Sequence, residues 1–478
     1  MTTECDLSDP TDLAGLRRYL AAHDPESRLA PLAMVQVEIS DGAHFRVLSA
    51  VQAALAAAGK PSPAKVVVLT DTTDITRRGA LLRTLVNDQL TDDHAVKAVT
   101  LDDGHPTLHA DDTTLDKAAA ALSGADLVVT IGSGTMTDIG KVAAQRNGGI
   151  PHVAVQTAAS VDGFTDNVSV VLRNGVKRTV PSAWPTVVLA DVTTIGEAPR
   201  ALNTSGFGEA ISLFTAPADW YLANLTGLDT TFHPASMALL KAAAASPPDW
   251  SAGIAAGEAT ATKNLARLLA LRGIVSGISN TTACLSGVEH VISHMLDLHH
   301  AAHHQPIGLH GAQVGVASLV ASKLWRRAIA GGLIDVQRLQ KPDMPKLEKK
   351  VRAAFAHLGT GGSIADECWG DCQRKWTLAL ANWDKLEGVA RNWSQHSVEF
   401  AKMVQPAEVL RPALVASGSP ATFGALSPAI APSLARWAVA NCHLMRNRFN
   451  LVDLLELMGL WTDDLIDWTL AETVGGAA

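Results

Sequence analysis

The sequence predicts a protein of two domains, an N-terminal α/β domain built on a doubly wound parallel sheet and an all-α C-terminal domain. Three observations lead to this fold class. Short β-branched segments alternate with helical segments as far as about residue 200, helical patterns alone follow, and 478 residues suffice for two hydrophobic cores. We place the domains at residues 1–203 and 204–478.

Strands that are covered on both faces of a sheet are continuous apolar runs, and the N-terminal domain contains such runs. We expect strands at 64–71, 125–134, 151–160 and 186–191, with helices at 77–90 and 136–146. The segment VLRNGVKRTV (171–180) differs, because an Asn-Gly pair separates its two apolar halves. That pattern predicts a β-hairpin inserted at the edge of the domain.

Helical periodicity defines the C-terminal domain. We expect helices at 259–277, 312–329, 346–358, 432–448 and 450–460. The segment 359–400, which holds GTGGS and several tryptophans, follows no clear pattern and is treated as a candidate insertion.

The composition argues against several classes of protein. Hydrophobic residues make up 47% of the chain and charged residues 18%, which is typical of a folded globular protein. The net charge of −8, without a Lys/Arg cluster, argues against a nucleic-acid partner. We expect no secretory signal, because the start MTTECDLSDP is polar and acidic, and no membrane span. Five scattered cysteines fit a reducing cytoplasm better than a disulfide framework.

The segment TIGSGTMTDIGK (130–141) lies between a predicted strand and a predicted helix. Gly132 and Gly134 would let the backbone approach a bulky anion, and the N–H groups at the start of the helix favour negative charge. The GxGxxG spacing is absent, so a plain tight turn is the alternative to a pyrophosphate site. The strand–turn–helix context favours the phosphate. Thr135 and Asp138 could instead serve as caps or solvated surface residues.

A histidine-rich segment, EHVISHMLDLHHAAHHQPIGLHG (289–311), contains the candidate metal ligands. His290 and His294 lie four residues apart on one face of a predicted helix, and His310 begins the next helix. With Glu209 as the carboxylate, His290 and His310 would form a three-ligand cation site with an open position. A purely structural HxxxH pair is the alternative. The other histidines of the segment are predicted to be solvated residues of a polar connection: His299, His300, His303 and His304.

Taken together, the motifs resemble those of the sn-glycerol-1-phosphate dehydrogenases. The resemblance rests on GSGTMTDIGK, QTAASVDGFTDN, GVKRT, SGFGEAIS, SGVEHVISHMLD and LHGAQVGV, and it extends from about residue 60 to RNRFNLVDLLELMG near the C-terminus. This family is part of the superfamily of dehydroquinate synthase and the iron-containing alcohol dehydrogenases. The resemblance implies a dehydroquinate synthase-like fold, with a Rossmann-like NAD(P)-binding domain and a helical domain that binds a divalent metal, Zn²⁺ or Ni²⁺.

The resemblance also implies a role for individual residues. The cofactor would be bound by Asp71, Gly132, Ser133, Gly134, Thr135, Asp138, Thr157 and Ser160, and the metal by Glu209, His290 and His310. Asp162 would face the nicotinamide and the substrate, and His294 would assist proton transfer. Lys177 and Arg178 on the hairpin are candidate partners of a substrate phosphate, although solvated hairpin charges are an equal alternative.

The implied reaction is the NAD(P)-linked interconversion of dihydroxyacetone phosphate and sn-glycerol 1-phosphate, or of a related polyol phosphate, in a homo-oligomer. Two departures from the family keep other functions open. The family has Asp where this chain has Glu209, the ligand type of dehydroquinate synthase, and the loop 278–290 lacks the family's Arg-Pro pair. The alternatives are a sugar-phosphate cyclase and a non-catalytic family member that binds nucleotide.

Overall fold

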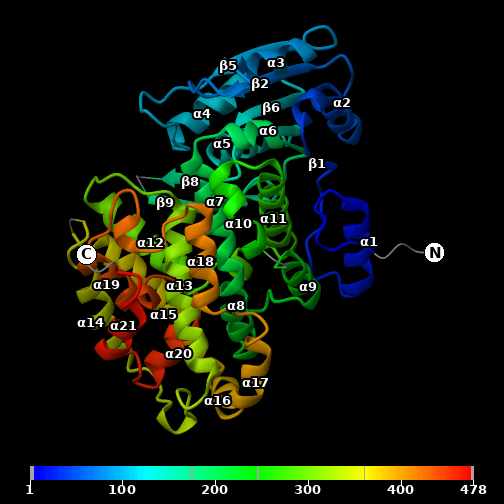
Figure 1. Ribbon diagram of the computed structural model, residues 1–478. Coiled ribbons are helices and arrows are strands. Elements are labelled where there is room, and N and C mark those ends of the chain that lie inside the picture. Colours follow the sequence, from blue (N-terminus) through cyan, green and yellow to red (C-terminus); the bar gives the residue numbers. More distant parts are fainter. Residues whose placement is uncertain (1–4, 174–175, 245–246, 360, 475–478) are drawn as a thin grey trace. The chain divides into compact units, whose positions relative to one another are not determined.

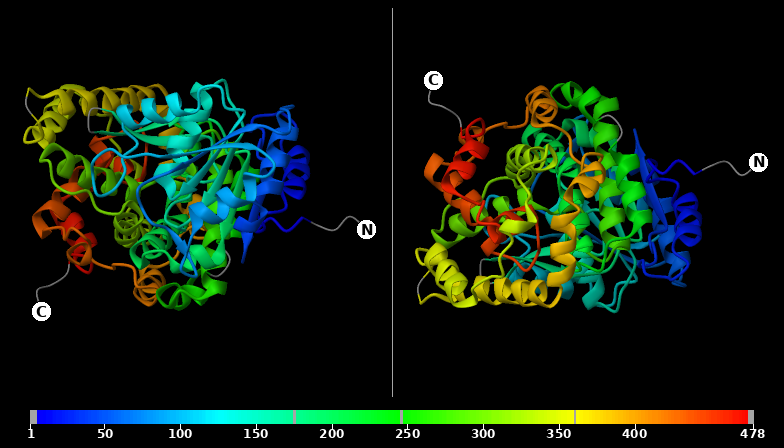
Figure 2. Two further views of the ribbon diagram at one scale, coloured as in Figure 1. Left: turned by 90° about the horizontal axis from the view of Figure 1, so that it is seen from above. Right: turned by 90° about the horizontal axis from the view of Figure 1, so that it is seen from below.

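The structure is a computed structural model that describes residues 5–173, 176–244, 247–359 and 361–474. Most of its elements are labelled in Figure 1, and Figure 2 shows it from above and from below. Contacts divide the chain into two compact units. Unit 1 comprises Met1–Gly206, His233–Ala245 and Trp250–Thr281, and unit 2 comprises Phe207–Phe232, Ser246–Asp249 and Thr282–Ala478.

Unit 1 is built on a six-stranded sheet in which every neighbouring pair is parallel. Along the sheet the strands are β1 (Gln36–Ser40), β10 (Val187–Asp191), β7 (His152–Gln156), β6 (Leu127–Gly132), β2 (Lys65–Thr70) and β5 (Ala95–Thr100). The four strands predicted from apolar runs are confirmed, and all of them have fully buried residues.

Helices cover both faces of this sheet, as a doubly wound fold requires. One hydrophobic cluster joins the strands to α2 (Val47–Ala57) and α3 (Leu82–Leu90). A second cluster, on other strand residues, includes α4 (Asp112–Ala121) and α5 (Gly134–Arg146). The unit also holds α1 (Leu13–His23), α6 (Val192–Glu197), α9 (Pro234–Ala243) and α11 (Ala259–Ile278).

Several details of unit 1 differ from the sequence predictions. Strands β1 and β5 were not predicted, because β1 is only half buried and the edge strand β5 is mostly exposed. The helix expected at 77–90 begins at Leu82, after a short hairpin of β3 (Thr76–Arg77) and β4 (Ala80–Leu81), which turns at Arg78 and Gly79 with positive φ. Contacts also group α9 and α11 with the sheet, whereas the sequence predicts a single boundary after residue 203.

The predicted hairpin at 171–180 is confirmed as antiparallel strands β8 (Val168–Arg173) and β9 (Val176–Pro181). Its turn residues, Asn174 and Gly175, lie outside the described residues. Helix α5 and strand β8 are in contact, so the hairpin packs on the helix that follows the glycine-rich turn.

Unit 2 is helical, as predicted. Helix α7 (Arg200–Ile211) crosses the unit boundary between Gly206 and Phe207, and α10 (Pro247–Ala256) crosses the one between Asp249 and Trp250. The remaining helices of unit 2 are α8 (Ala216–Leu225), α12 (Val288–Ala302), α13 (His310–Ile329), α14 (Met344–Phe355), α15 (Ser363–Ala381), α16 (Trp383–Arg391), α17 (Trp393–Phe400), α18 (Ala407–Ser417), α19 (Pro432–Asn441), α20 (Leu451–Leu457) and α21 (Asp463–Leu470). The segment 359–400, which had no clear pattern, forms α15 to α17. In the described part of the chain, no helix combines the length and apolar character that crossing a bilayer requires.

One prediction about the histidine-rich segment is wrong. Helix α12 continues to Ala302, so His299 and His300 are helical residues and not part of a connection. The side chain of His300 is buried. For the neighbouring His299, burial lowers the pKa to about 4. His303 and His304 follow the helix and are exposed, as predicted for solvated residues.

Candidate active site

The predicted site residues form two groups, one in each unit. In unit 1, β6 ends at Gly132 and α5 begins at Gly134, with Ser133 between them. A Cβ atom at Gly132 would lie 2.5 Å from Met136 Cγ, and one at Gly134 would lie 2.7 Å from Val161 Cγ2. Among the described residues no side chain caps α5, so the first N–H groups of this helix are available to an anion.

The loop that follows β7 lies beside this turn. The Thr157 N–H donates to the Gly132 carbonyl at 3.1 Å, and Thr157 and Ser160 are both buried. The loop is fixed from behind by Asn203, whose Oδ1 accepts from the Ala159 N–H at 3.0 Å. Of the predicted cofactor residues, Thr157 is thus hydrogen-bonded to the glycine-rich turn, and Ser160 lies on the same loop as Thr157. Asp71 follows β2, the strand that pairs with β6, at the same carboxyl edge of the sheet.

Asp162 has a partner that the sequence did not indicate. Arg272 Nε and Nη2 each lie 3.2 Å from Asp162 Oδ2, and the Arg272 side chain is fully buried in α11. The available signal was an arginine among the apolar residues of the predicted helix 259–277, followed directly by Gly273. The ion pair holds the Asp162 carboxylate in place at the end of the loop.

Asp138 has contacts other than those expected of a cofactor ligand. Its Oδ2 accepts from the Val170 N–H at 3.2 Å, and its Oδ1 lies 3.6 Å from Lys141 Nζ. Lys141 is completely buried, 2.5 Å from Asp166 Oδ1. Burial raises the pKa of Asp138 to about 7 against the opposing effect of Lys141. The three residues tie α5 to the hairpin, so a cofactor role for Asp138 stays a prediction without geometric support.

Of the two hairpin cations, only one can be described. The Lys177 side chain lies outside the described residues, while Arg178 is half buried on β9 opposite Val171. Both belong to unit 1, and their role toward a substrate phosphate stays a prediction.

The glycine-rich turn leads to a first test. Changing Gly134 to Val should reduce NAD(H) affinity at least tenfold, about 1.4 kcal/mol, because the new side chain meets Val161 and displaces the loop beside the turn. Fluorescence titration with NADH measures the effect. Gly388→Val is the matched control, since a Cβ atom there meets nothing within 4 Å. Equal affinities in the two variants would reject the phosphate site.

In unit 2, the three predicted metal ligands come together from three helices. Glu209 lies on α7, His290 in the first turn of α12, and His310 at the first position of α13. Glu209 Oε1 is 3.0 Å from His290 Nε2, and Glu209 Oε2 is 3.8 Å from His310 Nε2. Ligand atoms of a tetrahedral zinc ion are about 3.3 Å apart, so these separations suit a cation between the side chains. The Glu209 side chain is 4% exposed and that of His310 is 25% exposed.

Other side chains orient the two imidazoles. Glu289 Oε1 is 3.0 Å from His290 Nδ1, and the same carboxylate accepts from the Gly287 N–H at 2.7 Å and the Thr215 hydroxyl at 2.8 Å. Ser293 Oγ lies 3.0 Å from His310 Nδ1. Each histidine therefore presents Nε2 to Glu209 while its other nitrogen is held, which is the usual arrangement of metal-binding histidines. Sequence reasoning missed Glu289, although it directly precedes His290.

The surrounding charges and burial shift the pKa values of His290 and His294 in opposite directions. Although burial lowers it, the neighbouring Glu209 and Glu289 raise the pKa of His290 to about 9, so the two carboxylates bind a positive charge at this point. His294 is the opposite case. Burial, then the charges of His310, Arg446 and His290, lower its pKa well below 6.5. Its ring centroid lies 5.4 Å from that of His310. His294 is thus a neutral imidazole beside the candidate cation site.

Known proteins resemble this chain in sequence and in fold. The sequence model of the family described as iron-containing alcohol dehydrogenase matches residues 46–199. The glycerol-1-phosphate dehydrogenase [NAD(P)+] of Bacillus velezensis is 32% identical over 241 residues, which are 50% of this chain and 59% of the relative. The enzyme of that name from Aeropyrum pernix is 34% identical over 207 residues, 42% of this chain and 57% of the relative.

The chain is similar in sequence to the glycerol-1-phosphate dehydrogenases. The predicted resemblance is therefore confirmed. The chain spans less than two thirds of the length of these two glycerol-1-phosphate dehydrogenases.

Solved structures confirm the predicted fold class. NADH-dependent butanol dehydrogenase A of Thermotoga maritima superimposes with a TM-score of 0.53 at 15% identity, over 91% of this chain and 98% of the other. A probable glycerol dehydrogenase of Sinorhizobium meliloti gives 0.54 at 15% identity, over 91% and 97%. The α/β unit and the helical unit thus have the fold of these two solved structures.

Proposed function

We propose that this chain is a metal-dependent, NAD(P)-linked dehydrogenase that interconverts dihydroxyacetone phosphate and sn-glycerol 1-phosphate or a related polyol phosphate. The observation that carries the proposal is the convergence of Glu209, His290 and His310, with Glu289 behind His290. The names of the similar proteins support the substrate. The donor set of two imidazoles and one carboxylate suits Zn²⁺ or Ni²⁺.

In this proposal, different residues contribute to metal binding, proton transfer and cofactor binding. When bound, the divalent ion withdraws charge from the substrate oxygens and the reduced nicotinamide supplies the hydride. Glu209, His290 and His310 hold the cation position, and Glu289 fixes the ring of His290. His294, neutral at physiological pH, moves a proton between the developing alkoxide and solvent. The glycine-rich turn and Thr157 bind and orient the cofactor.

A phosphorylated substrate needs a cation within reach, and unit 2 offers Arg448. This guanidinium donates to the Ser286 carbonyl at 3.4 Å and to the Thr282 hydroxyl, so it lies against the loop that lacks the family's Arg-Pro pair. Arg446 and Arg448 both act on the pKa of His294. Burial and Arg446 lower the pKa of Arg448 to about 10, which leaves it charged at neutral pH. We propose that Arg448, with Arg446, binds the substrate phosphate.

Changing Arg448 to Gln should raise the KM for dihydroxyacetone phosphate about 10- to 100-fold, the value of one or two charged hydrogen bonds. The KM for unphosphorylated dihydroxyacetone should stay the same, and Arg448→Lys should recover part of the loss. Steady-state kinetics on both ketones measure this. An equal rise for both ketones would assign Arg448 a structural role on its loop.

The proposed function is tested by a panel of triose and polyol phosphates with NADH and with NADPH, in the presence of Zn²⁺ or Ni²⁺. We expect reduced-cofactor absorbance to fall with dihydroxyacetone phosphate. Glu209 favours one other candidate, the sugar-phosphate cyclase, which would release inorganic phosphate from a sugar phosphate without net cofactor consumption. Binding of NAD(H) without turnover of any compound would support the non-catalytic alternative. A homo-oligomer, a cytoplasmic location and the lack of a nucleic-acid partner stay predictions.

A further inference from the structure

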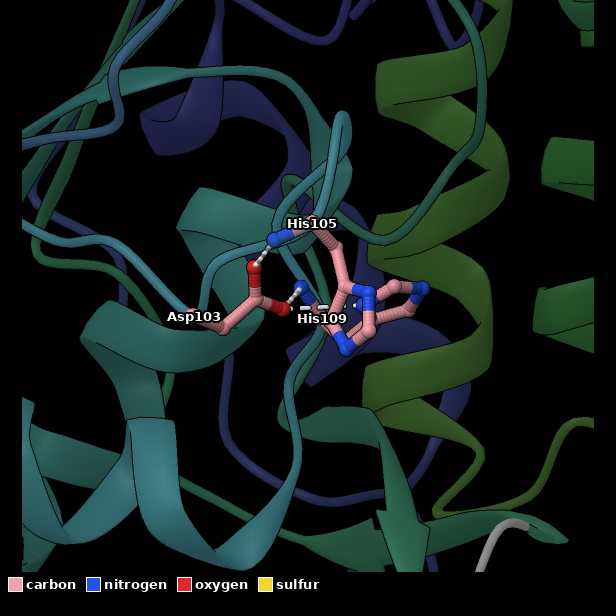
Figure 3. A group of neighbouring side chains, drawn as sticks. All are labelled: Asp103, His105 and His109. Carbon is pink, nitrogen blue, oxygen red and sulfur yellow. Dashed lines mark hydrogen bonds and ion pairs between the residues drawn. The ribbon is translucent and has the colours of Figure 1, made fainter.

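A second set of metal-ligating side chains lies in unit 1, in the loop between β5 and α4 (Figure 3). Asp103, His105 and His109 each offer one ligand atom, and these atoms lie within 4.8 Å of one another. The two other such sets among the described residues share His310 and belong to the site of unit 2. The loop therefore carries a separate cluster that the proposed dehydrogenase reaction does not use.

The loop is folded around the Asp103 carboxylate. Asp103 Oδ1 accepts from the His105 N–H at 3.0 Å, and Oδ2 accepts from the His109 N–H at 2.9 Å. Gly104, with a φ of +79°, allows the chain to turn between Asp103 and His105. Although burial raises it, these hydrogen bonds and His109 lower the pKa of Asp103 on balance. The carboxylate is thus ionised and fixed before any ligand arrives.

Both imidazoles lie beside this carboxylate, as Figure 3 shows. Their ring centroids are 5.1 Å apart, and His109 Nδ1 is 2.8 Å from Asp103 Oδ2. The Asp103 side chain is only 7% exposed, whereas that of His109 is 40% exposed. No Lys or Arg of the described chain lies within ion-pair distance of Asp103. The ion-pair partner of this carboxylate is therefore the His109 imidazole, a group that can itself bind a metal ion.

We propose that Asp103, His105 and His109 bind a divalent transition-metal ion of the Zn²⁺ or Ni²⁺ class, with water completing its coordination. Two imidazoles and a carboxylate on one short loop are ligands that these ions prefer. The ion would lie between His109 Nδ1 and Asp103 Oδ2. The pair then opens from 2.8 Å toward the roughly 3.3 Å between ligands of a tetrahedral ion, a shift of about 0.5 Å.

The ends of the loop indicate what the ion would do. The Leu101 N–H donates to the Thr70 carbonyl of β2 at 2.7 Å, and the Ala110 carbonyl accepts from the Leu172 N–H of β8 at 2.9 Å. An ion that joins Asp103 to His109 would therefore stiffen a loop anchored to two other elements of unit 1. One anchor directly precedes Asp71, at the carboxyl edge of the sheet.

Zinc titration of the full chain by isothermal calorimetry tests this inference. In the variant Glu209→Gln/His310→Ala, which lacks the ligands of the unit 2 site, one Zn²⁺ per chain should still bind. Adding His105→Gln and His109→Gln should weaken that binding more than about 100-fold, since even indirect contacts to a metal contribute 10- to 100-fold. The matched control replaces two exposed histidines elsewhere, His303→Gln and His304→Gln, and should retain the ion.

Zinc binding that survives in the His105/His109 variant, or that is absent from the Glu209/His310 variant, would overturn the inference. If the Glu209/His310 variant does not fold, ion counts on the otherwise unchanged chain decide. Elemental analysis after reloading should give two ions per chain, and one for His105→Gln/His109→Gln. Two ions in that variant would also overturn it. Neither result depends on dehydrogenase activity, so the proposed function stands or fails separately.

Discussion

Replacing His310 by Ala should remove one bound ion per chain and nearly all dehydrogenase activity. His310 is one of three side chains whose ligand atoms converge, and its Nδ1 is already held by Ser293. Loss of indirect contacts to a metal costs about 10- to 100-fold in affinity, so loss of a direct ligand should cost more than 100-fold. Elemental analysis and the NADH-linked assay on the same preparation measure both effects.

The matched control for this change is His303→Gln/His304→Gln, which removes two imidazoles from the same histidine-rich segment. Both residues are exposed, and we expect full metal content and full activity. His299 and His300 are unsuitable for this control, because they lie in α12 and their loss would disturb packing. A His310→Ala protein with its full complement of ions would contradict the ligand assignment.

Replacing His294 by Gln should leave the ion in place and lower kcat by roughly 10²- to 10⁴-fold, the usual contribution of a general acid or base. The neutral imidazole lies beside His310, with a ring centroid separation of 5.4 Å, and glutamine keeps a polar side chain of similar reach but cannot relay a proton. Pre-steady-state rates of NADH oxidation and the metal content of the variant provide the measurement.

This second change also distinguishes two possible ligand sets. His294, Asp297 and His310 form another group whose ligand atoms are within 4.8 Å of one another. If the ion lies there, His294→Gln loses metal while Glu209→Gln retains it. If it lies between Glu209, His290 and His310, the two variants behave in the opposite way. The hydrogen bond between Glu289 and His290 favours the second arrangement.

The sequence predicted those parts of the molecule in which the local residue pattern is typical of one secondary structure only. Buried parallel strands such as β2 and β6 are unbroken apolar runs, and the Asn-Gly pair marks its hairpin. The edge strand β5 was missed because exposure removes that pattern. His299 and His300 were assigned to a connection, because polar residues were taken to end a helix that in fact continues to Ala302.

The candidate site shows the same limit. The three candidate metal ligands were predicted from residue type and spacing together with the family resemblance, and the structure brings them together. The residues that orient them were not, because Glu289, Ser293 and Arg272 have no distinguishing pattern of their own. Their roles follow from contacts between positions far apart in the chain, such as Arg272 with Asp162 and Glu289 with Thr215.

The most direct test of the proposed function is metal-dependent oxidation of NADH by dihydroxyacetone phosphate. The full chain is stripped with a chelator, reloaded with Zn²⁺ or Ni²⁺, and assayed beside an identically treated His310→Ala protein. We predict that stripping abolishes NADH oxidation, that reloading restores it in the unchanged chain, and that it does not in the variant. Two results would contradict a metal-dependent dehydrogenase built on Glu209, His290 and His310. One is that the stripped protein oxidises NADH at an undiminished rate, and the other is that the protein reloaded with either ion does not oxidise NADH.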